Sequence, residues 1–160
     1  MKHVINLFRK MLGPRQPMLY LSNSVAEGVH GDGNITKLAD AAQALRHALV
    51  KIGSDADHVA VTTAGTEVPL GVCDDECTAA EDNINVQLLG QKQGTILMVA
   101  HAAIDAGDFV VAAAAGRVQT IDGITNGTYY IVGRAINAAT AQDDLIEVAH
   151  CVPVQRVVSG

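Results

Sequence analysis

The sequence predicts a mainly β fold: a compact β-barrel or β-sandwich-like (β-tulip-like) domain with one short helix and an extended N-terminal arm. Between residues 94 and 158, short apolar runs alternate with Gly, Asp and Asn, a pattern typical of strands and turns. The apolar content is 49%, but Trp is absent and there are only two Phe and three Tyr. Such small side chains favour closely packed sheets over a deep ligand pocket with aromatic walls. A length of 160 residues indicates one domain plus an extension.

Residues 1–35 are predicted to form the arm and a linker, and residues 36–160 the β-rich domain. On a helical wheel, the apolar and polar side chains of residues 2–12 separate onto opposite faces. The apolar face holds Val4, Ile5, Leu7, Phe8, Met11 and Leu12, and the polar face holds Lys2, His3, Asn6, Arg9 and Lys10. Gly13 and Pro14 end the pattern. We interpret this segment as one that orders on a partner; an inert terminus and a membrane-surface helix are the alternatives.

The charge distribution favours a partner-binding arm. Four of the eleven basic residues lie in the first 20 positions, and the first acidic residue is Glu27. These four are Lys2, Arg9, Lys10 and Arg15. A basic arm on an acidic body favours docking onto an acidic surface, including another copy of the same body. An acidic body with few aromatic side chains argues against a nucleic-acid partner, and no apolar run is long enough to predict a membrane-spanning helix.

The first half of the domain contains the predicted helix and several half-buried strands. Residues 36–45 carry apolar side chains at helical spacing behind an N-cap at Thr36, and this predicts the short helix. The apolar positions are Leu38, Ala41, Ala42 and Leu45. A strand is predicted over residues 46–52, with continuation of the helix to Gly53 as the alternative. Residues 83–88 alternate between apolar and amide side chains, which predicts a strand with one buried face.

Two further strands are predicted between these elements. Residues 58–62 alternate, with Val59 and Val61 pointing inward. Pro69 lacks a backbone donor, so the run 68–72 is predicted to be an edge strand or the start of a strand.

The later runs lose this alternation. Residues 96–99 and 129–132 are apolar on both faces, which predicts cover on both sides in a barrel centre, a sandwich or a subunit interface. The loop 105–108 fits a hairpin connection with Gly107 at positive φ. Near the C-terminus, one face of a strand is predicted to carry three apolar side chains while Glu147 points away. These three are Ile146, Val148 and Val152.

A search for chemistry finds no nucleophile motif, phosphate-binding loop or zinc spacing. Cys73 and Cys77 form a single C-x3-C pair, and three cysteines do not predict a disulfide framework. The remaining candidate is a convergence of His101, His150 and Cys151, which would make the protein a small β-barrel enzyme or binding module. We expect instead a protein that is not an enzyme and has no cofactor or metal site.

An ordered set of motifs between residues 46 and 158 resembles the capsid decoration, or cement, proteins of tailed bacteriophages. The set begins with Arg46–Lys51. It continues with the segments 68–72 (Val-Pro-Leu-Gly-Val), 104–108 (Ile-Asp-Ala-Gly-Asp), 133–135 (Gly-Arg-Ala), 145–148 (Leu-Ile-Glu-Val) and 151–154 (Cys-Val-Pro-Val). Residues 1–35 match nothing in the common core of that family.

The resemblance implies a structural virion protein that stabilises an assembled head from its outer surface. It implies the major capsid protein and further copies of the chain as partners, with a trimer bridging capsomers, and synthesis in the cytoplasm of the host bacterium. It implies no catalytic residue. From the residues themselves, we expect the arm to contact the capsid or a neighbouring copy through Lys2, Val4, Ile5, Leu7, Phe8, Arg9, Lys10, Met11, Leu12 and Arg15.

Overall fold

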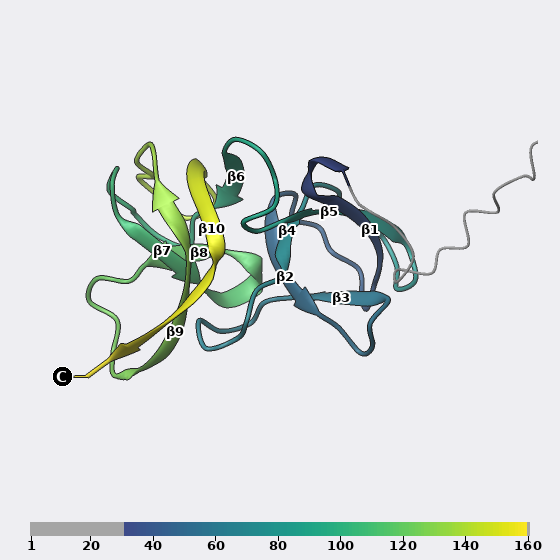
Figure 1. Ribbon diagram of the computed structural model, residues 1–160, viewed down its shortest axis with the longest axis horizontal. Coiled ribbons are helices and arrows are strands. Elements are labelled where there is room, and N and C mark those ends of the chain that lie inside the picture. The colour runs from purple at the N-terminus through teal and green to yellow at the C-terminus, as the bar shows by residue number, and fades with distance from the viewer. Residues whose placement is uncertain (1–30, 160) are drawn as a thin grey trace, which may run out of the picture.

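The computed structural model describes residues 31–159 and consists of strands joined by turns and loops (Figure 1). The ten strands of the described residues form two five-stranded sheets. One sheet is a closed barrel and the other almost closes on itself. The mainly β, barrel-like fold predicted from the sequence is therefore confirmed.

The first sheet, which we call barrel 1, is closed. Its strands are β1 (Asn34–Ala39), β2 (Ala48–Ile52), β3 (His58–Val61), β4 (Gly71–Cys73) and β5 (Asn83–Leu88). They follow one another around the barrel in the order β1-β3-β2-β4-β5. β1 runs parallel to β3 and antiparallel to β5, and the other neighbours are antiparallel.

The second sheet, which we call barrel 2, follows directly in the chain. Its strands are β6 (Ile96–Val99), β7 (Phe109–Ala112), β8 (Val118–Thr120), β9 (Gly127–Ala135) and β10 (Leu145–Val158). Their order is β6-β10-β9-β7-β8. Ala100 and Val118 form a parallel bridge, and the amide of His101 donates to the carbonyl of Val118 at 2.8 Å. These contacts nearly close barrel 2. Between β7 and β8 lies the 3-10 turn η2 (Ala114–Gly116), and η1 (Gly31–Gly33) precedes β1.

Barrel 2 repeats the strand pairing of barrel 1. In both barrels the first strand lies antiparallel to the fifth and meets the third in parallel, and the second strand lies between the third and the fourth. The fourth strand pairs with the fifth in both. Corresponding residues, such as Ile35 and Ile96 or Gly71 and Gly133, lie about 60 positions apart. The chain therefore contains two copies of one structural unit.

The turns before β5 and β10 are built in the same way. In barrel 1, Asp82 accepts hydrogen bonds from the amides of Thr78 and Ala79, at 2.9 and 3.0 Å. In barrel 2, Asp144 accepts the equivalent bonds from Thr140 and Ala141, at 2.8 and 3.0 Å. The residue before each aspartate has positive φ, 67° in one turn and 70° in the other. A shared Thr-Ala-x-x-Asp sequence thus produces the same turn twice.

Each barrel has a glycine in its fourth strand that packs directly against the fifth strand. It is Gly71 in β4 and Gly133 in β9. A Cβ atom on Gly71 would meet Val86 Cγ1 at 2.6 Å, and a Cβ atom on Gly133 would meet Val148 Cγ1 at 2.5 Å. Real Cβ atoms do not approach so closely, so both positions require glycine for space.

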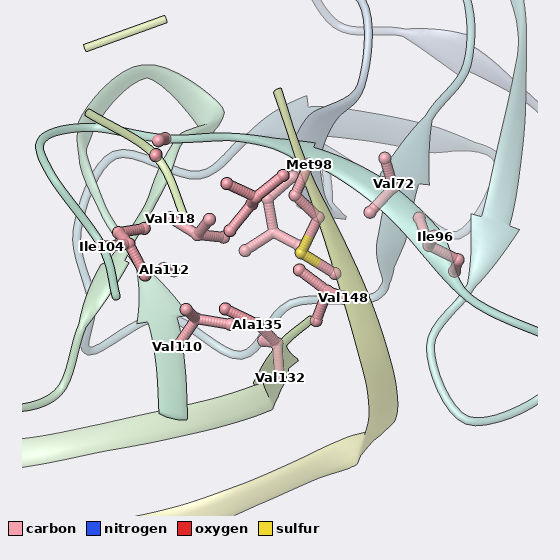
Figure 2. Packing of buried hydrophobic residues seen from close by; sticks show 14 of the residues in the cluster. Val72, Ile96, Met98, Ile104, Val110, Ala112, Val118, Val132, Ala135 and Val148 are labelled. Carbon is pink, nitrogen blue, oxygen red and sulfur yellow. The ribbon is translucent and has the colours of Figure 1, made fainter. Parts of the chain in front are cut away.

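The apolar core has two parts. Barrel 1 encloses its own cluster, which includes Val50, Ile84 and Val86. The cluster of barrel 2 includes Met98, Val110 and Ile146, but it also takes in residues from the outside of barrel 1. These are Leu49, Val72 and Leu89; Figure 2 shows Val72 beside Ile96 and Met98. Barrel 1 thus covers one end of barrel 2, and the two barrels share a continuous apolar contact.

The predicted helix at 36–45 is wrong. Most of its first half belongs to β1, in which Ile35, Lys37 and Ala39 point inward. Residues 34–38 of β1 pair with β5, and Leu38 and Ala39 pair with β3, whereas a helix this short would be only marginally stable in water. Tertiary pairing therefore overrides the local spacing. β1 also begins at Asn34, inside the stretch that composition assigned to the linker.

Most of the predicted strands are confirmed. The strand over 46–52 is β2, and 58–62 and 83–88 correspond to β3 and β5. Val59 is buried and Val61 is half-buried. β4 begins two residues after Pro69 and lies between β2 and β5, so Pro69 precedes a strand start.

Three details of the second half are corrected. Leu97 is 43% exposed, and Tyr129 and Tyr130 are half-buried, so residues 31–159 do not cover these strands on both sides. Gly107 has the predicted positive φ, at 99°. Its loop is not the turn of a hairpin, however, because Ile104 before the loop pairs with Ala139 and not with β7.

Val152 does not share a face with Ile146 and Val148. It is 57% exposed, whereas the other two are fully buried. An irregularity in the pairing of β10 between His150 and Val154 changes which side the following residues face.

Candidate functional site

The three residues proposed for chemistry do not form a site. The backbone of Ala100, next to His101, is hydrogen-bonded to the backbones of Asp143 and Asp144, which directly precede β10. His150 lies further along the same strand, by about 20 Å at about 3.3 Å per residue. His150 and Cys151 are neighbours in a strand, so their side chains point to opposite faces. His101 therefore cannot act together with the other two.

His150 and Cys151 serve structural contacts instead. The amide of Gly90 donates to His150 Nδ1 at 2.9 Å, which ties the end of barrel 1 to β10. Burial lowers the pKa of His150 and raises the pKa of the Cys151 thiol. The thiol is thereby held in its protonated, weakly nucleophilic form. His101 Nδ1 is buried and has no hydrogen-bond partner among residues 31–159.

Cys73 and Cys77 are buried free thiols. Cys73 Sγ donates to the carbonyl of Asp75 at 2.9 Å, and Cys77 Sγ to that of Ala41 at 3.4 Å. Burial raises the pKa of Cys73, which again favours the thiol over the thiolate. Within residues 31–159, no group of three or more His, Cys, Asp and Glu side chains is arranged to hold a metal ion.

The residues expected to bind a partner through the arm lie outside the described residues. They are Lys2, Val4, Ile5, Leu7, Phe8, Arg9, Lys10, Met11, Leu12 and Arg15. Their role remains a prediction from the sequence.

The described part of the chain offers a different candidate, an apolar and basic surface on barrel 2. A groove of about 440 Å³ lies there, with a mixed wall of apolar and charged side chains. We define the Phe109 face as Phe109, Ile121, Ile124, Ile131, Arg134 and Arg156; all but Arg134 line the groove. Phe109 is 52% exposed although it is one of only two Phe in the chain. Exposed aromatic and Arg side chains are the types enriched at protein interfaces.

Arg134 supports Phe109 from the neighbouring strand. Its guanidinium lies 5.8 Å from the centre of the Phe109 ring, and its Nε donates to the carbonyl of Gly107 at 2.5 Å. The two side chains are opposite each other in the β7–β9 pairing. The arrangement presents a fixed aromatic ring and a cation to solvent, so it suits recognition and not proton transfer.

Sequence reasoning missed this face because Phe109 and Arg134 belong to different motifs, far apart in the chain. The available signal was the internal repeat. Aligning Gly133 with Gly71 would have placed Arg134 where barrel 1 has Val72.

No protein-family model matches the chain, and no curated protein matches it. Among residues 31–159, no helix is long and apolar enough to cross a membrane.

Proposed function

We propose that this chain is a structural virion protein that binds the outer surface of an assembled phage capsid and stabilises it, as a trimer that bridges capsomers. The observation that carries the proposal is where the distinctive side chains lie. Barrel 2 already buries an aliphatic core that includes Met98, Ile104 and Ile146, yet four further apolar side chains are at least 49% exposed: Phe109, Leu145, Val154 and Val157. A rigid body with apolar residues outside suits contact with other proteins.

The motif resemblance supports the same function. The turn before Phe109, the Gly-Arg-Ala segment 133–135 and the Leu-Ile-Glu-Val segment 145–148 all lie in barrel 2. The first directly precedes Phe109, the second contains Arg134 opposite Phe109, and the third contains Leu145. The proposed partner is the major capsid protein.

Stabilisation of a shell would come from repetition. A protein that binds only the assembled lattice favours assembly by mass action, and many equivalent weak contacts add through multivalency. The basic arm adds a contact to acidic surface. Its six apolar side chains would each contribute about 1.5–3 kcal/mol if fully buried, before the cost of ordering the segment.

The test is co-sedimentation of the full chain with emptied phage heads. We expect saturable binding and heads that resist heating or dilution better than bare heads. A variant with Lys2, Arg9, Lys10 and Arg15 changed to Gln should bind at least about tenfold more weakly. A variant with four basic residues of the body changed to Gln (Lys51, Lys92, Arg46 and Arg117) is the matched charge control. Failure of the unmodified chain to bind heads from any tailed phage tested would contradict the proposal.

A further inference from the structure

The contact between the two barrels within one chain joins two different faces. On barrel 1 it uses the outside of β2 and β4, where Leu49 and Val72 are fully buried against the cluster of barrel 2. On barrel 2 it uses the end formed by Ala112 and η2. Gly116 in η2 approaches Ala48 and Val61 so closely that a Cβ atom would lie 2.7 Å from each. The first face we call the side face, and the second the end face.

The internal repeat shows which residues occupy the other side face and the other end face. In the β2–β4 pairing Leu49 is opposite Val72, and in the β7–β9 pairing Phe109 is opposite Arg134. Phe109 and Arg134 therefore form the side face of barrel 2, which is part of the Phe109 face.

The end faces correspond in the same way. Ala112 is opposite Val118, and Ile52 is opposite Val59 in the equivalent β2–β3 pairing. Ile52 and the loop 53–57, which replaces η2, therefore form the end face of barrel 1.

Residues 31–159 leave these two faces uncovered, and both carry large apolar side chains. Leu49 and Ala112 are 0% exposed, whereas their counterparts Phe109 and Ile52 are 52% and 50% exposed. A side chain of this size costs about 1.5–3 kcal/mol of lost burial when it faces water. Both halves of the barrel-to-barrel contact thus exist a second time, and no other part of the described residues covers them.

The charges of the free faces are complementary. The side face of barrel 2 carries Arg134 and Arg156, with Asp122 as the one acidic residue lining its groove. The end face of barrel 1 carries Asp55 and Asp57, both exposed, and Asp55 also pairs with His58 of its own chain at 2.7 Å. Opposite charges on two apolar-centred faces favour their association and disfavour pairing of either face with itself.

We propose that the side face of barrel 2 binds the end face of barrel 1 of a second copy, so that copies associate head to tail. Phe109 meets the surface around Ile52, and Arg134 and Arg156 meet Asp55 and Asp57. The contact is not an identical copy of the one inside the chain, because Asp57 stands at the position of Gly116 and cannot approach a strand as closely. Repetition of such a contact closes into a ring or continues as a filament.

The test measures self-association of the full chain by sedimentation velocity over a range of concentrations. Phe109→Asp destroys only the side face and Ile52→Asp only the end face. We expect each variant alone to associate at least about tenfold more weakly than the unmodified chain. Ile136→Asp, at a comparably exposed apolar position directly after β9, should associate normally. Circular dichroism and thermal unfolding of each variant confirm that it folds.

Mixing the two defective variants gives the decisive result. In a head-to-tail contact, the intact end face of Phe109→Asp binds the intact side face of Ile52→Asp, so the mixture forms heterodimers but nothing larger. A second experiment exchanges the charges. Arg134→Glu should weaken association of the chain with itself. A second chain that carries both Asp55→Lys and Asp57→Lys should bind the Arg134→Glu chain again.

Other occupants give other outcomes, and each overturns the proposal. If the Phe109 face pairs with itself, Ile52→Asp associates normally. If the arm of a neighbour covers the face, a Leu7→Ser and Phe8→Ser variant loses association while Ile52→Asp keeps it. A chain that stays monomeric at all concentrations, with no effect of either variant, also contradicts the contact. None of these readouts involves capsids, so this contact can fail while capsid binding holds; a chain that stays monomeric would in addition remove the trimer from the proposed function.

Discussion

Barrel 1 and barrel 2 have the same strand pairing but differ in which side chains are buried and which are exposed. Barrel 1 encloses Lys37, whereas barrel 2 has Met98 at the equivalent position. Barrel 1 buries the outer apolar residues Leu49 and Val72 against its neighbour, whereas barrel 2 exposes Phe109 and Arg134. The fold of the unit therefore depends on a few positions, namely the two glycines, the Thr-Asp turns and the aliphatic interior. The other positions differ between the two barrels. Because of these differences, the side face of barrel 1 is covered by barrel 2, whereas the side face of barrel 2 is exposed.

The largest expected effect comes from giving barrel 2 the lysine of barrel 1. Lys37 is tolerated because its amine donates to the carbonyl of Ala56 in the loop at the uncovered end of barrel 1. Met98 is 0% exposed and lies in a barrel whose equivalent end is covered. Met98→Lys should lower the free energy of unfolding by about 3–5 kcal/mol, because an ammonium group would be buried without a partner. Urea denaturation measures this. Met98→Leu is the control, and a lysine variant as stable as the leucine variant would contradict the account.

The next largest effect tests the glycines shared by the two barrels. Gly71→Ala and Gly133→Ala should each cost about 1–3 kcal/mol, since the new methyl group would press on the backbone of the fifth strand. Gly94 has φ of 87° but nothing within 4 Å of its would-be Cβ. Gly94→Ala should therefore cost only the strain of a left-handed alanine, about 1 kcal/mol. Equal losses at all three positions would mean that close packing is not the reason for the glycines.

The reverse exchange, Lys37→Met, should be mildly stabilising. Desolvation lowers the pKa of Lys37 below its ordinary 10.5, although Asp57 and Asp55 oppose the shift. Replacing a buried charge with an apolar side chain should raise the free energy of unfolding by about 1 kcal/mol at neutral pH.

The gain should depend on pH in one direction. Between the lowered pKa and 10.5, the unfolded chain binds more protons than the folded chain, so the unmodified protein gains stability as the pH rises. The advantage of Lys37→Met should therefore shrink in alkaline solution. An advantage that grows there would show that burial of the charge is not the cause.

The smallest effect separates two equivalent ion pairs. His58 pairs with Glu81 in barrel 1 at 3.0 Å, and Arg117 pairs with Asp143 in barrel 2 at 2.7 Å. The His58 ring donates hydrogen bonds to the carboxylates of Asp55 and Glu81, and these bonds, that to Asp55 first, raise its pKa above 6.5. The stability that this pair contributes is full below pH 6.5 and is lost as the pH rises through the raised pKa.

Glu81→Gln should therefore lower the pKa of His58 in an NMR titration and flatten the dependence of Tm on pH near neutrality. Asp143→Asn should leave the pH dependence unchanged, because Arg117 stays charged throughout. A His58 pKa unaffected by Glu81→Gln would remove Glu81 from the explanation.

Much of the fold could be predicted because turn residues and apolar period are local signals. The alternation in 83–88 and the aliphatic run at 96–99 fall in β5 and β6. The helix at 36–45 failed because Leu38, Ala41 and Ala42 fit a helical spacing as well as a short strand followed by a loop. The face around Phe109 and Arg134 could not be predicted from motifs, since strand pairing brings the two residues together.

By itself, the sequence determined the β class, the turns at glycine and aspartate, and the concentration of basic charge in the first 20 residues. These properties depend on residues close together in the chain. Only the tertiary structure decided that β1 is a strand, that ten strands divide into two equivalent barrels, and that one apolar outer face is covered while its counterpart is exposed. Such outcomes depend on contacts between distant residues, whose free energy no local pattern contains.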